Sequence, residues 1–411
     1  MSFANGLNGL NGLNGLNGLN GLNGLNGLNG LNGLNGLNGL NGLNGLNGLN
    51  GLSGSWNGAP GSVLTIHDAL AGLYTPPPSL PGPVPATEQD SLARWSSDVR
   101  ARILDAELFS QLAFSADPAN PRGFVVHSAQ QSWTSEPGGP HLSAQYDPIV
   151  TLVPPSIAQL GDRQLALVAN AALLRGDRVH EILGQIPAPL PYLGMFVPLS
   201  EERTRWTLEL LSTVFRLSVF VEMAFKHAFS LPRPHQLSPQ INPVIPTPLH
   251  GTLPSGHATE AFAMVALLVE LLEKAGAREA GRPWRERLFK LADRIAYNRT
   301  VAGVHFPVDN AAGAMLGVAL ARYLAARCQG SEASCHSWHF DASTFCEDEP
   351  DGFFDHTALI RQMDMGDGPP ADPAQTGGPA VVAGLSVQAR LTLGSSGVLG
   401  WLWQKALAEW A

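Results

Sequence analysis

Residues 254–275 read PSGHATEAFAMVALLVELLEKA, and this stretch indicates the architecture of the chain most directly. Ser255 is placed to cap the start of a helix, and the apolar residues that follow continue for several turns. The most apolar part, Ala261–Leu272, spans 12 residues and contains Glu270, so it is too short and too charged to cross a membrane. The stretch therefore predicts a helix inside a globular body rather than a membrane span.

The chain between residues 88 and 328 shows the same helical period, with apolar residues three to four positions apart. Dense proline predicts long ordered loops at 123–155 and 232–254. No run of alternating residues suggests a sheet, so the predicted fold class is all-α, a helical bundle. The predicted helices are Asp90–Ala116, Ser156–Leu174, Ser200–Phe229, His257–Ala275, Trp284–Arg299 and Asp309–Cys328.

The N-terminal part of the chain consists of 16 copies of Asn-Gly-Leu at residues 5–52. Glycine loses the most conformational entropy on ordering, and isolated leucines bury little apolar surface. We therefore predict a disordered low-complexity tail, with a self-associating segment as the alternative. The pattern argues against collagen despite glycine at every third position, because the triplets contain no proline.

Composition divides the chain into four parts. These are the repeat tail at 1–55, a Pro/Gly-rich linker at 56–87, a helical domain at 88–328, and an acidic, loop-rich C-terminal extension at 329–411 that ends in a helix near Trp401–Trp410.

The net charge of −9 is unevenly distributed along the chain. Ten acidic residues and one basic residue, Arg361, lie between Cys328 and Asp372, which leaves the rest of the chain neutral. No basic stripe is present that could follow a phosphate backbone, so we expect no nucleic-acid partner. No classical signal peptide or transmembrane segment is evident, and we expect a soluble protein, with the cytoplasm favoured.

Two segments place cations and backbone donors at predicted loop–helix junctions. In the first, Lys226 falls on the last turn of a helix, and Arg233 follows between two prolines. In the second, Ser255 and Gly256 begin a helix whose free N–H groups and dipole favour an anion. Each segment alone has an ordinary structural explanation, either an end charge that suits the helix dipole or a simple helix cap.

A third segment adds histidine chemistry to these cations. Arg299 ends one predicted helix, and His305 comes just before the next. Asp309 is close enough in sequence to accept a hydrogen bond from one ring nitrogen of His305, which would leave the other as a nucleophile or metal ligand. With His257, the three segments describe a cage of donors for a tetrahedral oxyanion, in which one histidine bonds to the central atom and the other moves protons.

These segments resemble the signature of the superfamily that contains acid phosphatases, type 2 phosphatidic acid phosphatases and vanadium-dependent haloperoxidases. The signature is Lys-x6-Arg-Pro, then Pro-Ser-Gly-His, then Ser-Arg-x5-His-x3-Asp, and it is matched from Lys226 to Asp309 except that Asn298 replaces the serine. The resemblance covers about residues 208–324. It implies a helical bundle of the vanadium haloperoxidase and acid phosphatase type.

The resemblance also implies a role for each matched residue. His305 would bond covalently to phosphorus or coordinate vanadium, Asp309 would support it, and His257 would be the acid–base group. A phosphoryl group in transfer and a bound vanadate share a trigonal, five-coordinate arrangement, so one cage can serve both. The residues that would hold the equatorial oxygens are Lys226, Arg233, Ser255, Gly256 and Arg299.

Two activities of this superfamily compete. His250 stands five residues before Ser255, where the resemblance associates histidine with algal bromoperoxidases and phenylalanine with fungal chloroperoxidases. A second imidazole there could hydrogen-bond bound peroxide or halide, although a solvated loop histidine is the alternative. We favour a haloperoxidase that uses vanadate as cofactor and hydrogen peroxide to oxidise halide, bromide or iodide ahead of chloride, to hypohalous acid.

The alternative enzyme is an acid phosphatase that hydrolyses phosphomonoesters through a phosphohistidine intermediate and needs no cofactor. A non-catalytic scaffold that only binds phosphate is a third possibility, against which the intact His257 and the His305–Asp309 pair argue. A homo-oligomer is left open. So is the carboxylate partner of His257, for which the acidic residues of 88–107 are the candidates.

Overall fold

The computed structural model describes residues 89–136, 139–187, 189–276, 283–330, 334–348, 354–365 and 382–411. The predicted tail at 1–55 and linker at 56–87 therefore lie outside the described residues. The chain divides into two units, Met1–Arg102 and Ile103–Ala411. The first contributes the short 3-10 helix η4 (Gln89–Arg94) and the start of α5 (Ser97–Phe109), and the second holds all the elements discussed below.

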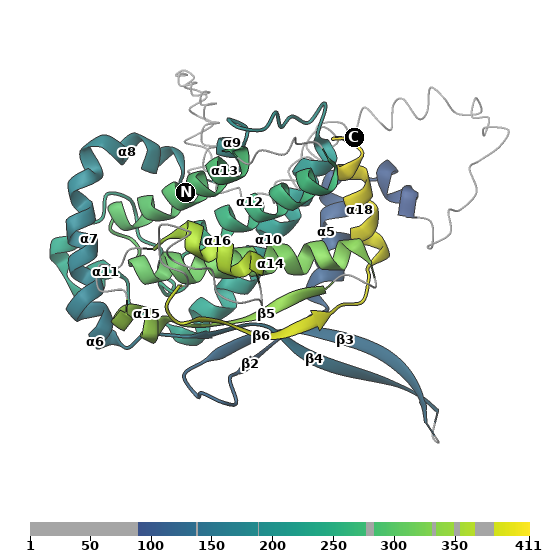
Figure 1. Ribbon diagram of the computed structural model, residues 1–411, viewed down its shortest axis with the longest axis horizontal. Coiled ribbons are helices and arrows are strands. Elements are labelled where there is room, and N and C mark those ends of the chain that lie inside the picture. Colours follow the sequence, from purple (N-terminus) through teal and green to yellow (C-terminus); the bar gives the residue numbers. More distant parts are fainter. Residues whose placement is uncertain are drawn as a thin grey trace, which may run out of the picture. The chain divides into compact units, whose positions relative to one another are not determined.

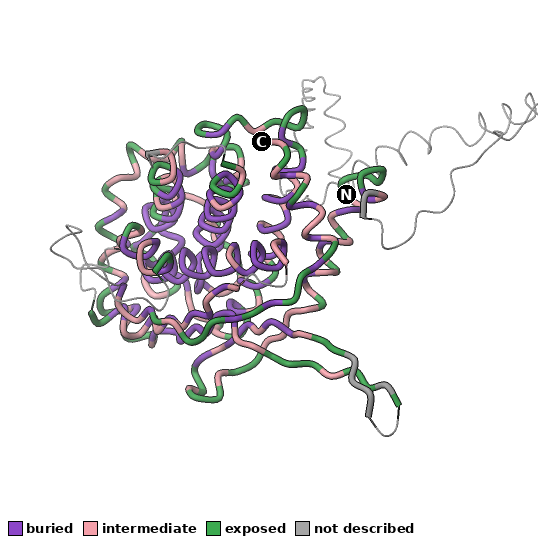
Figure 2. The backbone as a smooth tube through the Cα atoms, turned by 45° about the vertical axis from the view of Figure 1, so that its right-hand side comes forward, coloured by how far each residue is buried: buried purple, intermediate pink, exposed green. Residues whose placement is uncertain are grey.

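The second unit is built around α12 (Gly256–Lys274), the helix that starts at Pro-Ser-Gly-His. Every residue of α12 from 258 to 269 is buried, because α12 is enclosed by the other long helices (Figures 1 and 2). Those helices are α10 (Arg205–Phe229), α13 (Pro283–Val301), α14 (Pro307–Gln329) and α18 (Gly397–Leu407). The uninterrupted apolar run of α12 is thus the sequence signature of a central helix rather than of an amphipathic surface helix.

Close packing between α12 and α14 fixes the N-terminus of α12. A Cβ atom at Gly313 of α14 would lie 2.6 Å from the carbonyl oxygen of Ser255, and one at Gly317 would lie 2.3 Å from that of Thr259. Both distances are shorter than any normal contact, so only glycine lets the two backbones approach this closely. The first turn of α12 is held against the body of α14 by this fit.

Along the chain, shorter helices lie between α5 and α10 and between α10 and α12. The predicted helix at 156–174 is broken into α6 (Ile157–Gln159), the π-helical turn η5 (Leu160–Gln164), α7 (Leu165–Ala171) and the 3-10 turn η6 (Ala172–Leu174). The sequence reading did not include α8 (Arg175–Gly184) and α9 (Leu190–Leu193). The predicted loop at 232–254 contains α11 (Pro234–Leu237) and η7 (Pro239–Ile241).

A five-stranded sheet corrects the all-α prediction, since the protein is mostly helical but not entirely so. The strand order is β2-β3-β4-β5-β6, and every neighbouring pair is antiparallel except β4 and β5. The sheet packs beneath α10 and α14, while the outer end of the β3–β4 hairpin projects away from the helices and is exposed (Figures 1 and 2). Its strands are β2 (Leu112–Ala116), β3 (Phe124–Glu136), β4 (Gly139–Val153), β5 (Ser334–Asp341) and β6 (Leu385–Thr392).

The sequence concealed β3 and β4 for identifiable physical reasons. The outer half of β3, residues 129–136, has only Ala129 and Trp133 as apolar residues, so it lacks the alternation by which a half-buried strand is recognised. The outer half of β4 does alternate from Leu142 to Asp147, but a proline stands on either side of that stretch. Pro148, which favoured a loop, sits opposite His127 where the register shifts, and a bulge tolerates proline because no ladder hydrogen bond is lost there. The predicted helix from Asp90 likewise ends at Phe109, and its last residues form β2.

The C-terminal segment also contains more regular structure than its composition suggested. Its described residues form β5, α15 (Ala342–Asp348), α16 (His356–Met365), β6 and α18, the last of which overlaps the helix predicted near 401–410. Trp338 and Phe340 of β5 are fully buried against the helices. The many acidic residues at 341–355 made the segment look like a loop, although it also contains these buried apolar side chains. Within the described ranges, no helix is long and apolar enough to cross a membrane.

Candidate active site

Four helix ends bring the three sequence segments together in one buried site. Lys226 lies on the last turn of α10, Ser255 precedes α12, Arg299 lies on the last turn of α13, and His305 lies in the loop before α14. All four side chains are at most 5% exposed. Burying so many cationic and polar groups is costly unless they are matched by partners or by a ligand.

Arg233 connects the two histidine-bearing loops. Its Nη1 donates to the carbonyl oxygen of Val304 over 2.8 Å and lies 3.3 Å from Nε2 of His305. Its Nη2 lies 3.3 Å from Nδ1 of His250, and its Nε donates to the carbonyl oxygen of His250 over 3.2 Å. Burial lowers the pKa of Arg233, opposed by the nearby carboxylates of Asp309 and Glu222. The guanidinium is therefore held rigidly beside His305.

His305 is oriented by a carboxylate and a hydroxyl. Its Nδ1 lies 3.1 Å from Oδ2 of Asp309 and 3.2 Å from Oγ1 of Thr252. Thr252 itself donates to the same Asp309 oxygen over 2.5 Å, and the backbone N–H of Phe306 donates to it over 2.8 Å. Since Asp309 accepts, Nδ1 carries the proton and the lone pair resides on Nε2, which faces Arg233. The sequence reading anticipated Asp309 but missed Thr252.

The protonation states follow from burial and from the surrounding charges. Burial, followed by the charges of Arg233 and Lys226, lowers the pKa of His305 well below its usual value. Burial raises the pKa of Asp309 to about 6, although hydrogen bonds from Thr252 and Phe306 oppose the rise. At neutral pH the ring of His305 is therefore neutral, which is the form that can attack phosphorus or bind a metal.

Lys226 is enclosed by protein atoms. It is 2% exposed, its Nζ donates to the carbonyl oxygen of Pro254, and Nζ lies 3.6 Å from Oε1 of Glu222 one turn earlier on α10. Burial lowers the pKa of Lys226, and the charge of Glu222 opposes this most strongly. The sequence reading did not single out Glu222, because a lone acidic residue on an apolar helix carries no motif.

Ser255 and Arg299 carry buried polar atoms without partners among the described residues. The Oγ of Ser255 makes no hydrogen bond, so it does not cap α12, whereas its backbone N–H donates to the carbonyl oxygen of Asp309 over 2.9 Å. In Arg299, Nη2 donates to Oε1 of Gln185 over 2.8 Å, while Nε and Nη1 have no partner. Buried donors without partners cost free energy and are explained by a bound group that accepts from them. A tetrahedral oxyanion fits this donor set.

Gln185, which belongs to no part of the motif, is the centre of a hydrogen-bond network in the site. Its carbonyl oxygen lies 3.0 Å from Nε2 of His257, and its side chain accepts from both Arg299 and Asn298. Asn298 also donates to Oε1 of Glu181 over 2.9 Å. The substitution of asparagine for the usual serine therefore supplies an amide that holds Gln185. The partner of His257 is therefore the backbone carbonyl of Gln185, whereas the sequence suggested a carboxylate from residues 88–107.

The electrostatic environment of His257 keeps its ring neutral. Burial, followed by the charge of Arg299, lowers the pKa of His257 to about 3, although the hydrogen bond to Gln185 opposes the shift. With Nε2 donating to a carbonyl oxygen, Nδ1 retains a lone pair at neutral pH. His257 is thus placed to accept a proton.

His250 lies at the edge of the cage. Its half-buried ring sits beside the guanidinium of Arg233, and Nδ1 also lies 3.1 Å from the carbonyl oxygen of Gly251. Burial lowers the pKa of His250, and the charges of Lys226 and Arg233 contribute to the shift. A neutral imidazole in this position can offer a hydrogen bond to a small ligand that reaches Arg233.

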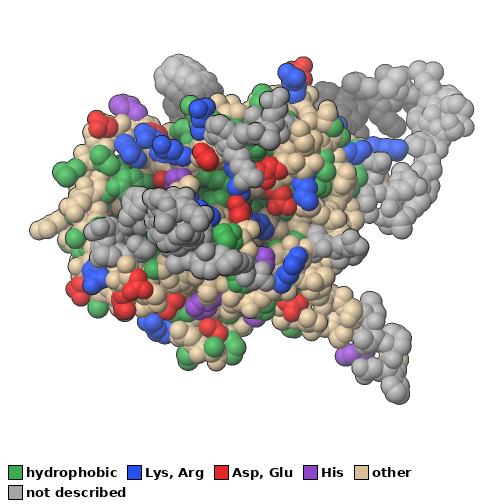
Figure 3. Space-filling model, in the orientation of Figure 1, with side chains coloured by type: hydrophobic (Ala, Val, Ile, Leu, Met, Phe, Trp, Pro, Cys, Tyr) green, Lys and Arg blue, Asp and Glu red, His purple; other side chains and the backbone are tan. Residues whose placement is uncertain are grey.

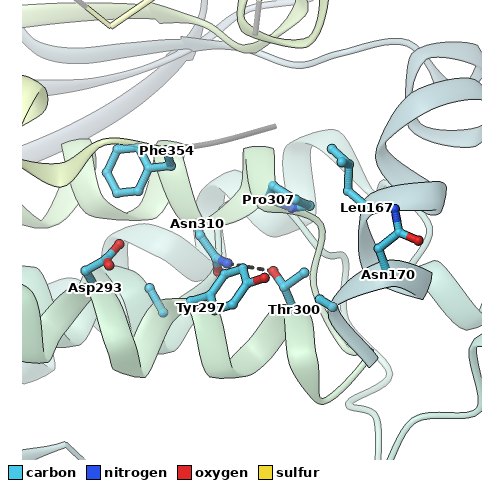
Figure 4. A pocket seen from close by; sticks show the side chains of 10 residues that line it. Leu167, Asn170, Asp293, Tyr297, Thr300, Pro307, Asn310 and Phe354 are labelled. Carbon is cyan, nitrogen blue, oxygen red and sulfur yellow. Dashed lines mark hydrogen bonds between the residues drawn. The ribbon is translucent and has the colours of Figure 1, made fainter. Parts of the chain in front are cut away.

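A separate pocket lies close to the site along the chain but contains none of the cage residues. It encloses about 430 Å³ between α7, α13 and the start of α14, and Asn310 donates to Oγ1 of Thr300 over 2.9 Å in its wall (Figure 4). Thr300 follows Arg299 and Asn310 follows Asp309. On the face shown in Figure 3, acidic and basic side chains are interspersed rather than segregated.

The fold and the site together define a mostly helical protein with a buried cluster of cations, unpartnered polar atoms and a neutral histidine. Comparison with known families agrees: residues 206–331 match the model described as the PAP2 superfamily, and the chain carries a PAP2 superfamily domain there. The range contains every candidate site residue, from Lys226 to Asp309. A model of the collagen triple helix repeat matches residues 4–63, where glycine recurs at every third position of the repeat. No curated protein matches the chain.

Proposed function

We propose that this protein is a vanadate-dependent haloperoxidase that oxidises bromide or iodide with hydrogen peroxide to hypohalous acid. Proteins of the PAP2 superfamily are generally phosphatases or haloperoxidases, and the cage described above suits either activity. The observation that favours the haloperoxidase is the position of His250. Its ring lies 3.3 Å from Nη2 of Arg233 at the edge of the cage, where a small anion or peroxide would arrive. A second imidazole there could hydrogen-bond the bound peroxide or the halide.

In this proposal, the chain's own residues hold the vanadate and neutralise its charge. Lys226, Arg233 and Arg299 offset the negative charge on its oxygens, and the partnerless Ser255 Oγ and Arg299 nitrogens donate to them. His305 offers Nε2 as the one ligand to vanadium, with Asp309 and Thr252 fixing its tautomer. When bound, vanadate supplies an electrophilic centre that activates hydrogen peroxide toward attack by halide.

His257 and His250 handle protons and the small substrates in this proposal. Formation of hypohalous acid and water from halide and hydrogen peroxide consumes one proton, so a group that exchanges protons with the oxygens is needed. His257 has a neutral ring with a free lone pair on Nδ1 and serves as that group. His250 orients the incoming peroxide or halide beside Arg233.

An acid phosphatase is the second candidate, and the arrangement around His305 supports it. Nε2 of His305 would attack phosphorus as the bond to the leaving oxygen breaks, and a proton from solvent, relayed through Nδ1 of His257, would add to that oxygen to release the alcohol. Water would then release phosphate from the histidine. The bond between Nδ1 and Asp309 stabilises the positive charge that develops on the ring during attack.

One pair of assays distinguishes the two activities. Purified protein is incubated with orthovanadate, hydrogen peroxide and bromide, and bromination of a phenolic dye is followed. In parallel, the protein without vanadate is incubated with p-nitrophenyl phosphate. The haloperoxidase is supported by vanadate-dependent bromination that His305→Ala abolishes. Hydrolysis of the phosphoester, with vanadate acting only as an inhibitor, would replace it with the phosphatase. If neither activity depends on His305, the site itself is wrongly assigned.

A further inference from the structure

A buried carboxyl group that is not part of the motif, that of Glu222, lies directly against Lys226 and Gly256 of the oxyanion cage, and a second, that of Glu260, is buried nearby on α12. Glu222 on α10 is 4% exposed, and Glu260, one turn into α12, is 9% exposed. The Oε1 of Glu222 lies 3.6 Å from Nζ of Lys226, and its Oε2 is buried without a partner among the described residues. A carboxyl group left this way needs either a proton or a ligand to satisfy it.

Glu222 also approaches the first turn of α12, whose N–H groups belong to the cage. A Cβ atom built on Gly256 would lie 2.6 Å from Oε1 of Glu222 and 3.2 Å from Oε2. Glycine at this position therefore makes room for the carboxyl group of Glu222 as well as for an anion. An oxyanion held by Ser255, Gly256 and Lys226 would lie beside this carboxyl group and would compete with it for Lys226.

The charges that face the two carboxyl groups can balance them only while no anion is bound. Burial raises the pKa of Glu222, and burial together with the negative charge of Glu222 raises the pKa of Glu260 to about 8. The charged groups around the two carboxyl groups come from several elements. They are Lys226 on α10, Arg233 before α11 and Arg299 on α13, together with Asp309 on α14, which acts on Lys226. Of these, Lys226 acts on both carboxyl groups, so it cannot fully compensate two negative charges and a bound dianion together.

We propose that Glu222 and Glu260 form a proton-accepting pair beneath the cage, and that binding of a tetrahedral dianion is coupled to uptake of a proton by this pair. Before binding, Lys226 neutralises the shared negative charge. When the anion takes Lys226 as a partner, a solvent proton adds to a carboxylate oxygen, and the neutral carboxyl group donates a hydrogen bond instead of repelling the anion. This inference rests on the oxyanion cage of the proposed function and applies to either enzymatic activity.

The sign of the pH dependence follows from this coupling. Anion binding stabilises the protonated pair, so the apparent pKa of the pair is higher in the complex than in the free protein. Affinity is therefore greatest at low pH and falls as pH rises through the range between the two values, by up to about tenfold per pH unit for one proton. In the free protein the pKa values of His257 and His305 are lowered far below this range, and any proton that either ring takes up on binding would also be taken up by a Glu222→Gln variant.

The experiment is calorimetric titration of the purified protein with tungstate, which is a tetrahedral dianion in weakly basic solution, the range in which the pair is expected to titrate. Two buffers of different ionisation enthalpy give the number of protons taken up. The wild type is expected to take up a substantial fraction of one proton near pH 8. Glu222→Gln is expected to take up less, to lose most of the pH dependence, and to bind at least as tightly as the wild type at about pH 9.

A matched control separates this effect from the general loss of a buried carboxyl group. Glu270 is also on α12 and has a raised pKa. It lies ten residues beyond Glu260, or about 15 Å along the helix axis. Unlike Glu222, its carboxyl group accepts a hydrogen bond from Gln329 over 2.6 Å. Glu270→Gln should retain the wild-type proton uptake. Glu260→Gln provides a second test if Glu222→Gln does not fold.

The possible outcomes identify which proposal fails. Tight tungstate binding without proton uptake in the wild type, or uptake unchanged in both Glu222→Gln and Glu260→Gln, overturns the proton-accepting pair and leaves the cage intact. Absence of tungstate binding to the folded wild type at any pH overturns the cage itself, and with it the proposed function.

Discussion

Thr252 Oγ1 donates a hydrogen bond to Asp309 Oδ2 over 2.5 Å, and the same carboxylate oxygen faces Nδ1 of His305. Burial raises the pKa of Asp309 and this hydrogen bond lowers it, with a net value of about 6. Thr252 lies in the loop before α12 and Asp309 in the first turn of α14, and the packing of α12 against α14 brings the two together. The charge state of Asp309, and through it the tautomer of His305, therefore depends on a hydroxyl group that belongs to no part of the motif.

Substitution of Thr252 by valine keeps the shape of the side chain but removes this bond. The pKa of Asp309 should rise further, because a hydrogen bond that stabilises the carboxylate is lost. Activity that needs the ionised carboxylate is present above that pKa and is lost as pH falls through it. The acid limb of the pH–rate profile should therefore move upward from about pH 6. A hydrogen bond to a charged group contributes about 1.5–3 kcal/mol, or about one to two pKa units, so the rate at pH 7 should fall about two- to tenfold.

The matched control is Thr213→Val on α10, which removes an equally buried hydroxyl that donates to the carbonyl oxygen of Glu209 over 2.7 Å. It should leave the profile in place. An acid limb that stays at the wild-type pH in Thr252→Val would show that the hydroxyl does not act through Asp309.

Asn298 offers a test of the hydrogen-bond network around Gln185. Asn298→Ser introduces the residue usual in the motif but removes the amide that donates to Gln185 and Glu181. Since Gln185 holds both His257 and Arg299, we expect weaker oxyanion binding and slower turnover, each by about five- to thirtyfold, which corresponds to about 1–2 kcal/mol. Tungstate affinity and kcat are the measurements. Asn170→Ser, at an exposed position on α7, should change neither. Wild-type affinity in Asn298→Ser would mean that Gln185 is held adequately by other contacts.

Gly256 and Glu222 should be coupled sterically. Gly256→Ala places a Cβ atom 2.6 Å from Oε1 of Glu222, so we expect a loss of stability of about 1–3 kcal/mol and weaker anion binding. Thermal unfolding of Gly256→Ala, Glu222→Ala and the double variant gives the interaction energy. Gly161→Ala, where a Cβ atom meets nothing within 4 Å, is the control. If the cost of Gly256→Ala is the same with Glu222 truncated, the close approach is not its cause.

The parts of this structure that sequence predicted share a local physical signal. The helix at α12 was recognisable because its apolar run directly follows the Pro-Ser-Gly-His segment, and Asp309 because it lies one turn from His305. Gln185, Thr252 and Glu222 come from other elements, and their contacts exist only after the chain has folded. Nothing in their local sequence distinguishes them from ordinary polar residues. The hairpin was missed because the outer half of β3 is almost entirely polar, and because the prolines that flank the alternating part of β4 indicated a loop although a bulge accommodates Pro148.

His250 carries the choice between the two proposed activities, and its substitution tests that choice. His250→Ala removes an imidazole that lies 3.3 Å from Arg233 but makes no contact with His305 among the hydrogen bonds found in the described part of the chain. Bromination should fall by about tenfold or more, the usual cost of losing a positioned hydrogen-bonding group in the transition state. Tungstate affinity should change less than about threefold, because the cage cations remain. His235→Ala on α11, whose ring lies 3.5 Å from Thr247, is the matched control and should have little effect on either measurement. Equal losses of bromination and tungstate affinity would show that His250 supports the cage as a whole. Loss of neither would leave it as a loop histidine, and the case for the haloperoxidase over the phosphatase would then rest on the assays alone.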